Sequence, residues 1–154
     1  MTDQPYTDLK AMHAALYAKL KTDSRLTSDY RIDTWDEGRF DMQNLPPTGI
    51  HARYERSSII PLEECQGYYT YQVNIVTWLL INIHGPEQQY SMAEMYLGRI
   101  KETMTDLSTD WSLSGNATDI RMTRTEYAQD WTDRRQSLLL CAAMYTVLVD
   151  IAHG

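Results

Sequence analysis

The side chains that could do chemistry are few and scattered along the chain. The four histidines are His13, His51, His84 and His153. A catalytic or metal site needs several such groups to converge, so we expect His13 to be a core-edge histidine and His84, which precedes Gly-Pro, to be a turn residue. The sequence has no glycine-rich phosphate loop, no nucleophile elbow and no paired Cys or His at metal-ligand spacing. We therefore predict no enzymatic activity, no metal and no cofactor.

A group of carboxylates raises the question of calcium binding. Its members lie close together in one polar stretch: Asp33, Asp36, Glu37 and Asp41. They lack the alternating ligand spacing and the following glycine of an EF-hand loop. The stretch is therefore interpreted as a solvated loop.

The two cysteines are expected to be buried thiols. The first residues, MTDQPYTD, are acidic and polar, so no signal peptide is expected, which indicates synthesis in a reducing cytoplasm. A reducing compartment disfavours a disulfide between Cys65 and Cys141. Cys65 also follows Glu63 and Glu64, an acidic setting that disfavours the thiolate. Cys65 would therefore be a poor nucleophile.

Length and charge restrict the class of protein. The chain has 154 residues and a formal net charge of −7. This length is typical of one domain. The negative charge argues against binding nucleic acid by phosphate neutralisation. No apolar run approaches the roughly 20 residues of a membrane span, so no membrane association is expected.

The strongest structural signal is the stretch Tyr68–Ile83, YYTYQVNIVTWLLINI. Every second residue from Tyr69 onward is apolar, aromatic or β-branched, which predicts a strand with one row of side chains in the core. Gly67 and His84-Gly85-Pro86 bound the run. A strand of this length is expected to bend, or to form one arm of a long hairpin.

Two helices and four further strands are predicted around this strand. The three- and four-residue spacing of apolar residues predicts a helix over Pro5–Lys21, and Ser91 with Glu94 forms a capping box that would begin a helix ending near Met104. Alternation predicts the remaining strands, over Leu26–Trp35, Gly49–Tyr54, Thr118–Tyr127 and Ser137–Ile151. Periodicity alone leaves a buried helix open for 138–151, and its β-branched end favours a strand.

This order, α-β-β-β-α-β-β, predicts one α+β domain over residues 1–154, with a mostly antiparallel sheet and two helices packed on one face. The aperiodic segment 36–47 is predicted to be a mobile loop. Tyr, Trp and Met are frequent at interfaces. Six apolar side chains in or beside predicted turns are assigned to subunit or ring contacts: Trp35, Phe40, Met42, Leu45, Trp111 and Trp131.

The overall pattern resembles the tail-terminator (tail-completion) proteins of long-tailed bacteriophages. The resemblance rests on DLKAMHAALYAKL, YYTYQVNIVTWLL and SMAEMYLGRIKETM, followed by DIRMTRTEY and SLLLCAAMYTVLVDI. It covers nearly the whole chain through pattern and length, and the last segment is more apolar than is usual in that family.

The resemblance implies a non-enzymatic virion protein of the tail or neck. Such a protein forms a homo-oligomeric ring, a hexamer in that family, that caps the tail tube and contacts the tail tube protein and the head–tail connector or head-closure protein. DNA would pass through without specific binding. Two alternatives remain open: another neck or head-completion component, and a small cytoplasmic ligand-binding module or enzyme with a pocket between helix and sheet.

Overall fold

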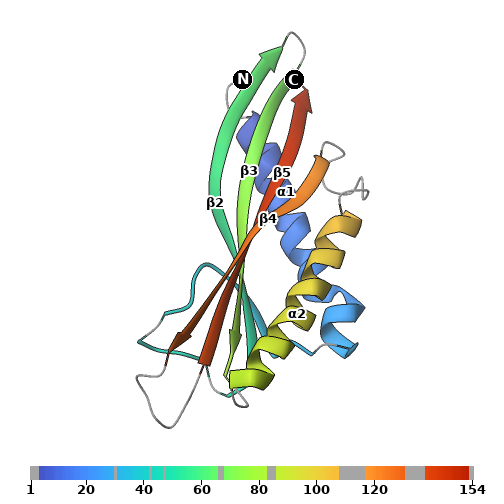
Figure 1. The fold of residues 1–154 in the computed structure, drawn as a ribbon. Helices are drawn as coiled ribbons and strands as arrows, with labels where there is room; N and C mark the ends of the chain where they lie inside the picture. Colours follow the sequence, from blue (N-terminus) through green and yellow to red (C-terminus); the bar gives the residue numbers. More distant parts are fainter. Residues whose placement is uncertain are drawn as a thin grey trace.

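The fold is a twisted five-stranded sheet with two long helices on one face (Figure 1). The computed structural model describes residues 4–29, 31–41, 43–46, 48–65, 68–82, 86–107, 117–130 and 138–152. The elements are α1 (Gln4–Thr22), a π-helical turn η1 (Arg25–Asp29), β1 (Thr34–Glu37), β2 (Ile50–Cys65), β3 (Tyr68–Ile81), α2 (Pro86–Leu107), β4 (Ala117–Asp130) and β5 (Leu138–Ala152). The strand order is β1-β2-β3-β5-β4, antiparallel except for β1 with β2. The predicted α+β class is confirmed.

Strand β3 is the centre of the sheet, as its alternation predicts. It pairs along its whole length with β2 on one side and β5 on the other. The odd-numbered row faces the helices, and Val73, Ile75 and Leu79 are fully buried there. Strand β2 is the second arm of the predicted long hairpin, and β2 and β3 extend past the ends of both helices (Figure 1).

The main core lies between the sheet and the helices. Helix α1 contributes a fully buried stripe of Met12, Leu16 and Leu20, as the three- and four-residue spacing predicts. Helix α2 contributes Ala93, Tyr96, Leu97, Ile100 and Met104. Among the elements that the structure describes, no helix covers the opposite face of the sheet.

The predicted strand over Leu26–Trp35 is wrong in its first part. Residues Arg25–Asp29 form a helical turn, and the strand begins only at Thr34. The carboxylate of Asp23 accepts a hydrogen bond from the backbone N–H of Arg25 at 2.8 Å, which favours helical geometry at this point. Leu26 is fully buried in the main core. The helical turn therefore explains why an apolar residue stands at this position.

Two predicted boundaries also need correction. Strand β2 runs to Cys65 instead of ending at Tyr54, and its register shifts between Arg56 and Ser58 and between Pro61 and Glu63. Each extra residue inverts the in–out pattern, so the alternation is hidden in the sequence. Helix α2 begins at Pro86, before the predicted capping box, because proline suits the first helical turn. The last segment is a strand, β5, as predicted.

Candidate functional site

The histidine on the α1 stripe belongs to the core. His13 is buried, and its Nδ1 shares a 2.8 Å hydrogen bond with the hydroxyl of Tyr54 on β2. Burial, with a smaller contribution from the charge of Arg56, lowers the pKa of His13 to about 4. The imidazole is therefore neutral at physiological pH. This arrangement supports the expected role as a core-edge histidine.

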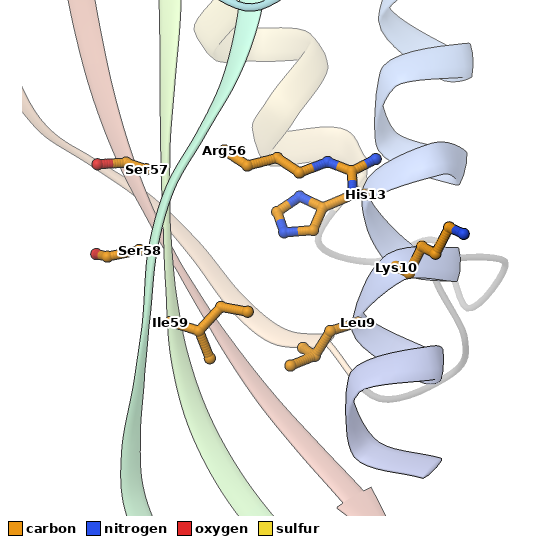
Figure 2. A pocket seen from close by; sticks show the side chains of 7 residues that line it. All are labelled: Leu9, Lys10, His13, Arg56, Ser57, Ser58 and Ile59. Atoms are coloured by element: carbon orange, nitrogen blue, oxygen red, sulfur yellow. The ribbon is translucent and has the colours of Figure 1, made fainter. Parts of the chain in front are cut away.

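A hollow of about 280 Å³ lies beside His13, between α1 and β2 (Figure 2). Lys10 and Arg56 bring positive charge to it, while Figure 2 shows the hydroxyls of Ser57 and Ser58 pointing away from α1. Ligand pockets in proteins usually enclose roughly 300 to 1,000 Å³ and converge several polar groups. This hollow lacks that convergence.

The carboxylates of the predicted solvated loop are paired with protein groups. Asp33 accepts a hydrogen bond from the backbone N–H of Ile50 at 2.9 Å. Asp36 lies 3.8 Å from Arg53 of β2, and Glu37 lies 3.6 Å from Arg56. Among the described residues, no group of three or more His, Cys, Asp or Glu side chains gathers to hold a metal ion.

Two further candidates, Cys141 and His51, are buried, while the side chain of Cys65 lies outside what the structure describes. Burial raises the pKa of the Cys141 thiol to about 12, so the thiolate is not populated near neutral pH. The Nδ1 of His51 lies 2.8 Å from the hydroxyl of Thr34. The helices that the structure describes are all too short or too polar to cross a membrane.

The most conspicuous surface is the helix-free side of the sheet. We call it the open face and define it by Val76 and Trp78 of β3 and Leu140, Ala142 and Met144 of β5. Strand register pairs Val76 with Met144 and Trp78 with Ala142, so these side chains form adjacent rungs. Two hollows, of about 370 and 350 Å³, lie on this face, and Trp78 lines both. The open face is thus a largely buried or half-buried apolar surface with two hollows, on which Trp78 and Leu140 also pack against the cluster formed by Phe40, Leu80 and Leu138.

Charged groups hold Trp78 in place. Its Nε1 donates a 2.6 Å hydrogen bond to a carboxylate oxygen of Glu55 on β2. Arg39 binds the same carboxylate at 2.8 Å, and its guanidinium lies 6.0 Å from the centre of the Trp78 ring system. The Glu55 side chain is only 14% exposed. Charge-assisted bonds of this kind are stronger than neutral ones, so the indole is presented in one orientation.

Exposed guanidinium groups border the open face. The side chains of Arg39, Arg121 and Arg124 are 73%, 78% and 66% exposed. Their carboxylate partners are less exposed: Glu55, Asp119 and Glu126. Each of the three guanidinium groups is thus already paired with a carboxylate of the same chain.

Beyond the open face, toward the hairpin tip, the same side of the sheet becomes polar. Asn74 donates to the hydroxyl of Ser58 at 2.8 Å and accepts from Thr146 at 3.0 Å. Gln72 donates to Asn74 at 3.2 Å. These bonds tie β2, β3 and β5 together where no helix covers this side.

Exposed apolar side chains lie on the hairpin. We call it the hairpin arm and define it as Ile59–Cys65 of β2 with Tyr68–Gln72 of β3. Ile59, Ile60 and Leu62 are 38%, 41% and 51% exposed. Strand β1 pairs with β2 only over His51–Tyr54, so the arm's part of β2 forms an edge of the sheet. Large apolar side chains on a projecting edge are typical of an interaction surface.

Of the six predicted contact residues, the structure describes three. Trp35 is buried in the main core, and its carbonyl accepts a 3.1 Å hydrogen bond from Tyr17. Phe40 packs with Leu80 and Leu138 in a second cluster on the helix-free side of the sheet, and Leu45 packs against that cluster. Met42, Trp111 and Trp131 lie outside the described residues. The assignment of these six to ring contacts remains a prediction, as does the mobility of the loop.

Neither the open face nor the arm is predicted from the sequence. A signal for the open face was present, because the outer row of β3 turns apolar at Val76 and Trp78. The adjacent Ile59 and Ile60 were a signal for the arm. Neither signal could be assigned to a surface before the register of β2 and β5 was known.

Comparison with known proteins gives one informative result. No protein-family profile and no curated protein matches the sequence. Among solved structures, the chain is similar to a chain from the virion of a native gene transfer agent particle, with a TM-score of 0.69 and 14% identity. The match covers 94% of this chain and 98% of the other. The two chains therefore share a fold over nearly their whole lengths.

Proposed function

We propose that this chain is a structural protein of a phage or phage-like virion and that it acts as the tail terminator. The supporting observation is the shared fold with a virion chain of a gene transfer agent, which extends over nearly all of both chains. The described residues also favour contact over catalysis, because the buried titratable groups do not converge while Ile59, Ile60 and Leu62 of β2 are exposed.

In this role the chain forms a homo-hexameric ring in the tail or neck of the virion. One side of the ring contacts the tail tube protein and the other contacts the head–tail connector or head-closure protein. The net charge of −7 suits a channel through which DNA passes without binding. The open face and the hairpin arm are different surfaces of one subunit, as the heterologous contacts of a ring require.

The test is assembly of the purified protein. Light scattering and negative-stain images at high concentration are expected to show rings with a central hole, and added tail tubes are expected to carry a ring at one end. Particles made without this chain are expected to have tubes of uncontrolled length.

Different results would redirect the assignment. If the rings bind particles, but particles made without this chain have tubes of normal length, the chain would be another neck component. A protein that stays monomeric and never associates with particles would contradict the virion role.

A further inference from the structure

We propose that the connection between β1 and β2 is a strap that opens as a unit and uncovers apolar side chains of β3 and β5 while the sheet stays folded. We define the strap by the described residues 38–41 and 43–46. The inference concerns the isolated subunit and does not depend on the tail-terminator role.

The strap covers apolar side chains on the helix-free side of the sheet. The ring of Phe40 packs with Leu80 of β3 and Leu138 of β5, and all three are buried. Because neighbouring residues of a strand face opposite sides, Leu80 points away from the row of β3 that packs on the helices. Partly buried side chains pack against this cluster: Leu45, Trp78 and Leu140. The strap therefore keeps apolar surface from water on a side where the structure describes no helix.

One side chain provides most of the burial in the strap. Phe40 is 8% exposed, and it is the one buried side chain among the described strap residues. Leu45 and Pro46 are half-buried, and the other long side chains are exposed: Arg39, Asp41, Gln43 and Asn44. Segments with few buried apolar contacts open at a lower free energy than the core of the same protein.

The backbone of the strap is not paired with the sheet along its middle. For residues 39–41 and 43–45, the backbone hydrogen bonds that the structure describes stay within the strap. The carbonyl of Asp41 accepts from the N–H of Asn44 at 3.1 Å, and its carboxylate accepts from the N–H of Gln43 at 3.0 Å. Strand β3, by contrast, is hydrogen-bonded to a neighbouring strand on each side. Lifting the strap therefore breaks no bond between strands.

Both ends of the strap are tied to the sheet. The N–H of Gly38 donates to the carbonyl of Tyr54 at 2.9 Å, and Gly38 has a φ of 92°, which favours glycine. At the far end, the side chain of Asn82 lies 3.5 Å from the carbonyl of Pro46, and its N–H donates to the carbonyl of Gly49 at 3.0 Å. The segment between these ends can lift while β1 and β2 stay in place.

Opening leaves the polar partners of the strap satisfied. Arg39 binds the carboxylate of Glu55 at 2.8 Å, and its side chain is 73% exposed, so water can replace this contact. Glu55 keeps its 2.6 Å hydrogen bond from Trp78, because both residues belong to the sheet. No buried charge loses its last partner when the strap lifts.

The experiment compares two thiols on opposite sides of the sheet. Leu80→Cys, in a Cys65→Ser background, places one thiol beneath the strap, and Cys141 of β5 is fully buried in the main core. Both are exposed to a thiol reagent at pH 8 in low concentrations of urea, and mass spectrometry of peptides gives each rate. Circular dichroism checks folding, and Leu138→Cys is the second reporter if Leu80→Cys does not fold.

The thiol beneath the strap is expected to react roughly tenfold or more faster than Cys141, with a rate that depends only weakly on urea. Arg39→Gln removes the ion pair between the strap and β2, and it should raise this rate by roughly two- to fivefold while leaving that of Cys141 unchanged. Arg121→Gln, which removes an exposed ion pair with Asp119 on β4, is the matched control and should change neither rate.

Two results would overturn the inference. Equal rates with equal urea dependence for the two thiols would mean that the strap opens only when the subunit unfolds. A fast reaction beneath the strap that Arg39→Gln leaves unchanged would mean that the reagent enters by another route.

Discussion

The Nδ1 of His13 on α1 lies 2.8 Å from the hydroxyl of Tyr54 on β2, and this hydrogen bond joins helix to sheet inside the core. The two rings meet edge to face, with their centres 6.0 Å apart. Tyr54 is also buried, and burial raises the pKa of its hydroxyl above the ordinary value. Both partners are therefore neutral, and protonating the imidazole would place a charge in an apolar layer.

This pair predicts a specific pH dependence of stability. The pKa of His13 is lowered from 6.5 to about 4 in the folded chain. Above pH 6.5, His13 is largely neutral in both the folded and the unfolded chain, so its lowered pKa has little effect on stability. As the pH falls from 6.5 toward 4, His13 becomes protonated in the unfolded chain but stays neutral in the folded chain. The free energy of unfolding is expected to fall by roughly 3 kcal/mol across this window. His13→Gln should remove that slope in urea titrations, and an unchanged slope would assign it to other groups.

The inward row of β3 predicts large truncation effects. Ile75 and Leu79 are fully buried between the sheet and the helices. Alanine at either position is expected to lower the free energy of unfolding by about 2–5 kcal/mol, because the cavity cannot collapse against a paired central strand. Met95→Ala, at an exposed position on α2, is the control and should change it by less than about 0.5 kcal/mol. Equal losses of unfolding free energy at Met95 and at Ile75 or Leu79 would mean that the odd-numbered row of β3 is not the buried one.

Burial of Phe40 changes what its truncation should do. From the sequence, this side chain is expected to anchor the loop on a neighbouring subunit. In the structure it is 8% exposed and contacts Leu80 and Leu138, with the guanidinium of Arg53 at 5.2 Å from its ring. Phe40→Ala is therefore expected to destabilise the isolated subunit by roughly 3 kcal/mol. A variant with unchanged unfolding but impaired assembly would instead support the intersubunit role.

Glu55 is expected to matter more than other surface glutamates. Its carboxylate accepts hydrogen bonds from both Trp78 and Arg39. Glu55→Ala leaves the indole N–H without its partner, at an expected cost of about 1–3 kcal/mol. Glu126→Ala removes a more exposed carboxylate that pairs only with Arg124 among the ion pairs described. In denaturant titrations, Glu126→Ala should lower the free energy of unfolding by less than Glu55→Ala does. Equal losses in the two variants would show that Glu55 does not hold Trp78.

The thiol of Cys141 should report unfolding. It is fully buried, and burial raises its pKa to about 12. In a Cys65→Ser background, we expect no reaction with a thiol reagent at pH 8 in the folded chain and prompt reaction in denaturant. Rapid modification of the folded protein would reveal local opening of β5.

The sequence by itself determined the elements whose local pattern is uninterrupted. Every second residue of β3 from Tyr69 onward is apolar, aromatic or β-branched, so this row had to be buried once the strand formed. Helix α1 repeats its apolar residues at helical spacing. Periodicity left β5 open between strand and buried helix, and its β-branched end favoured the strand that the structure shows. The α+β class followed from the order of these elements.

Only the tertiary structure decided the remainder. Strand β2 changes register twice, and each shift inverts its in–out pattern, so its length depends on pairing with β3. The helical turn at Leu26 depends on burial in the core and on the Asp23 hydrogen bond. Phe40 is buried by Leu80 and Leu138, which lie far from it in the sequence. The open face and the hairpin arm likewise arise from long-range pairing, because register and helix placement decide which apolar residues remain uncovered.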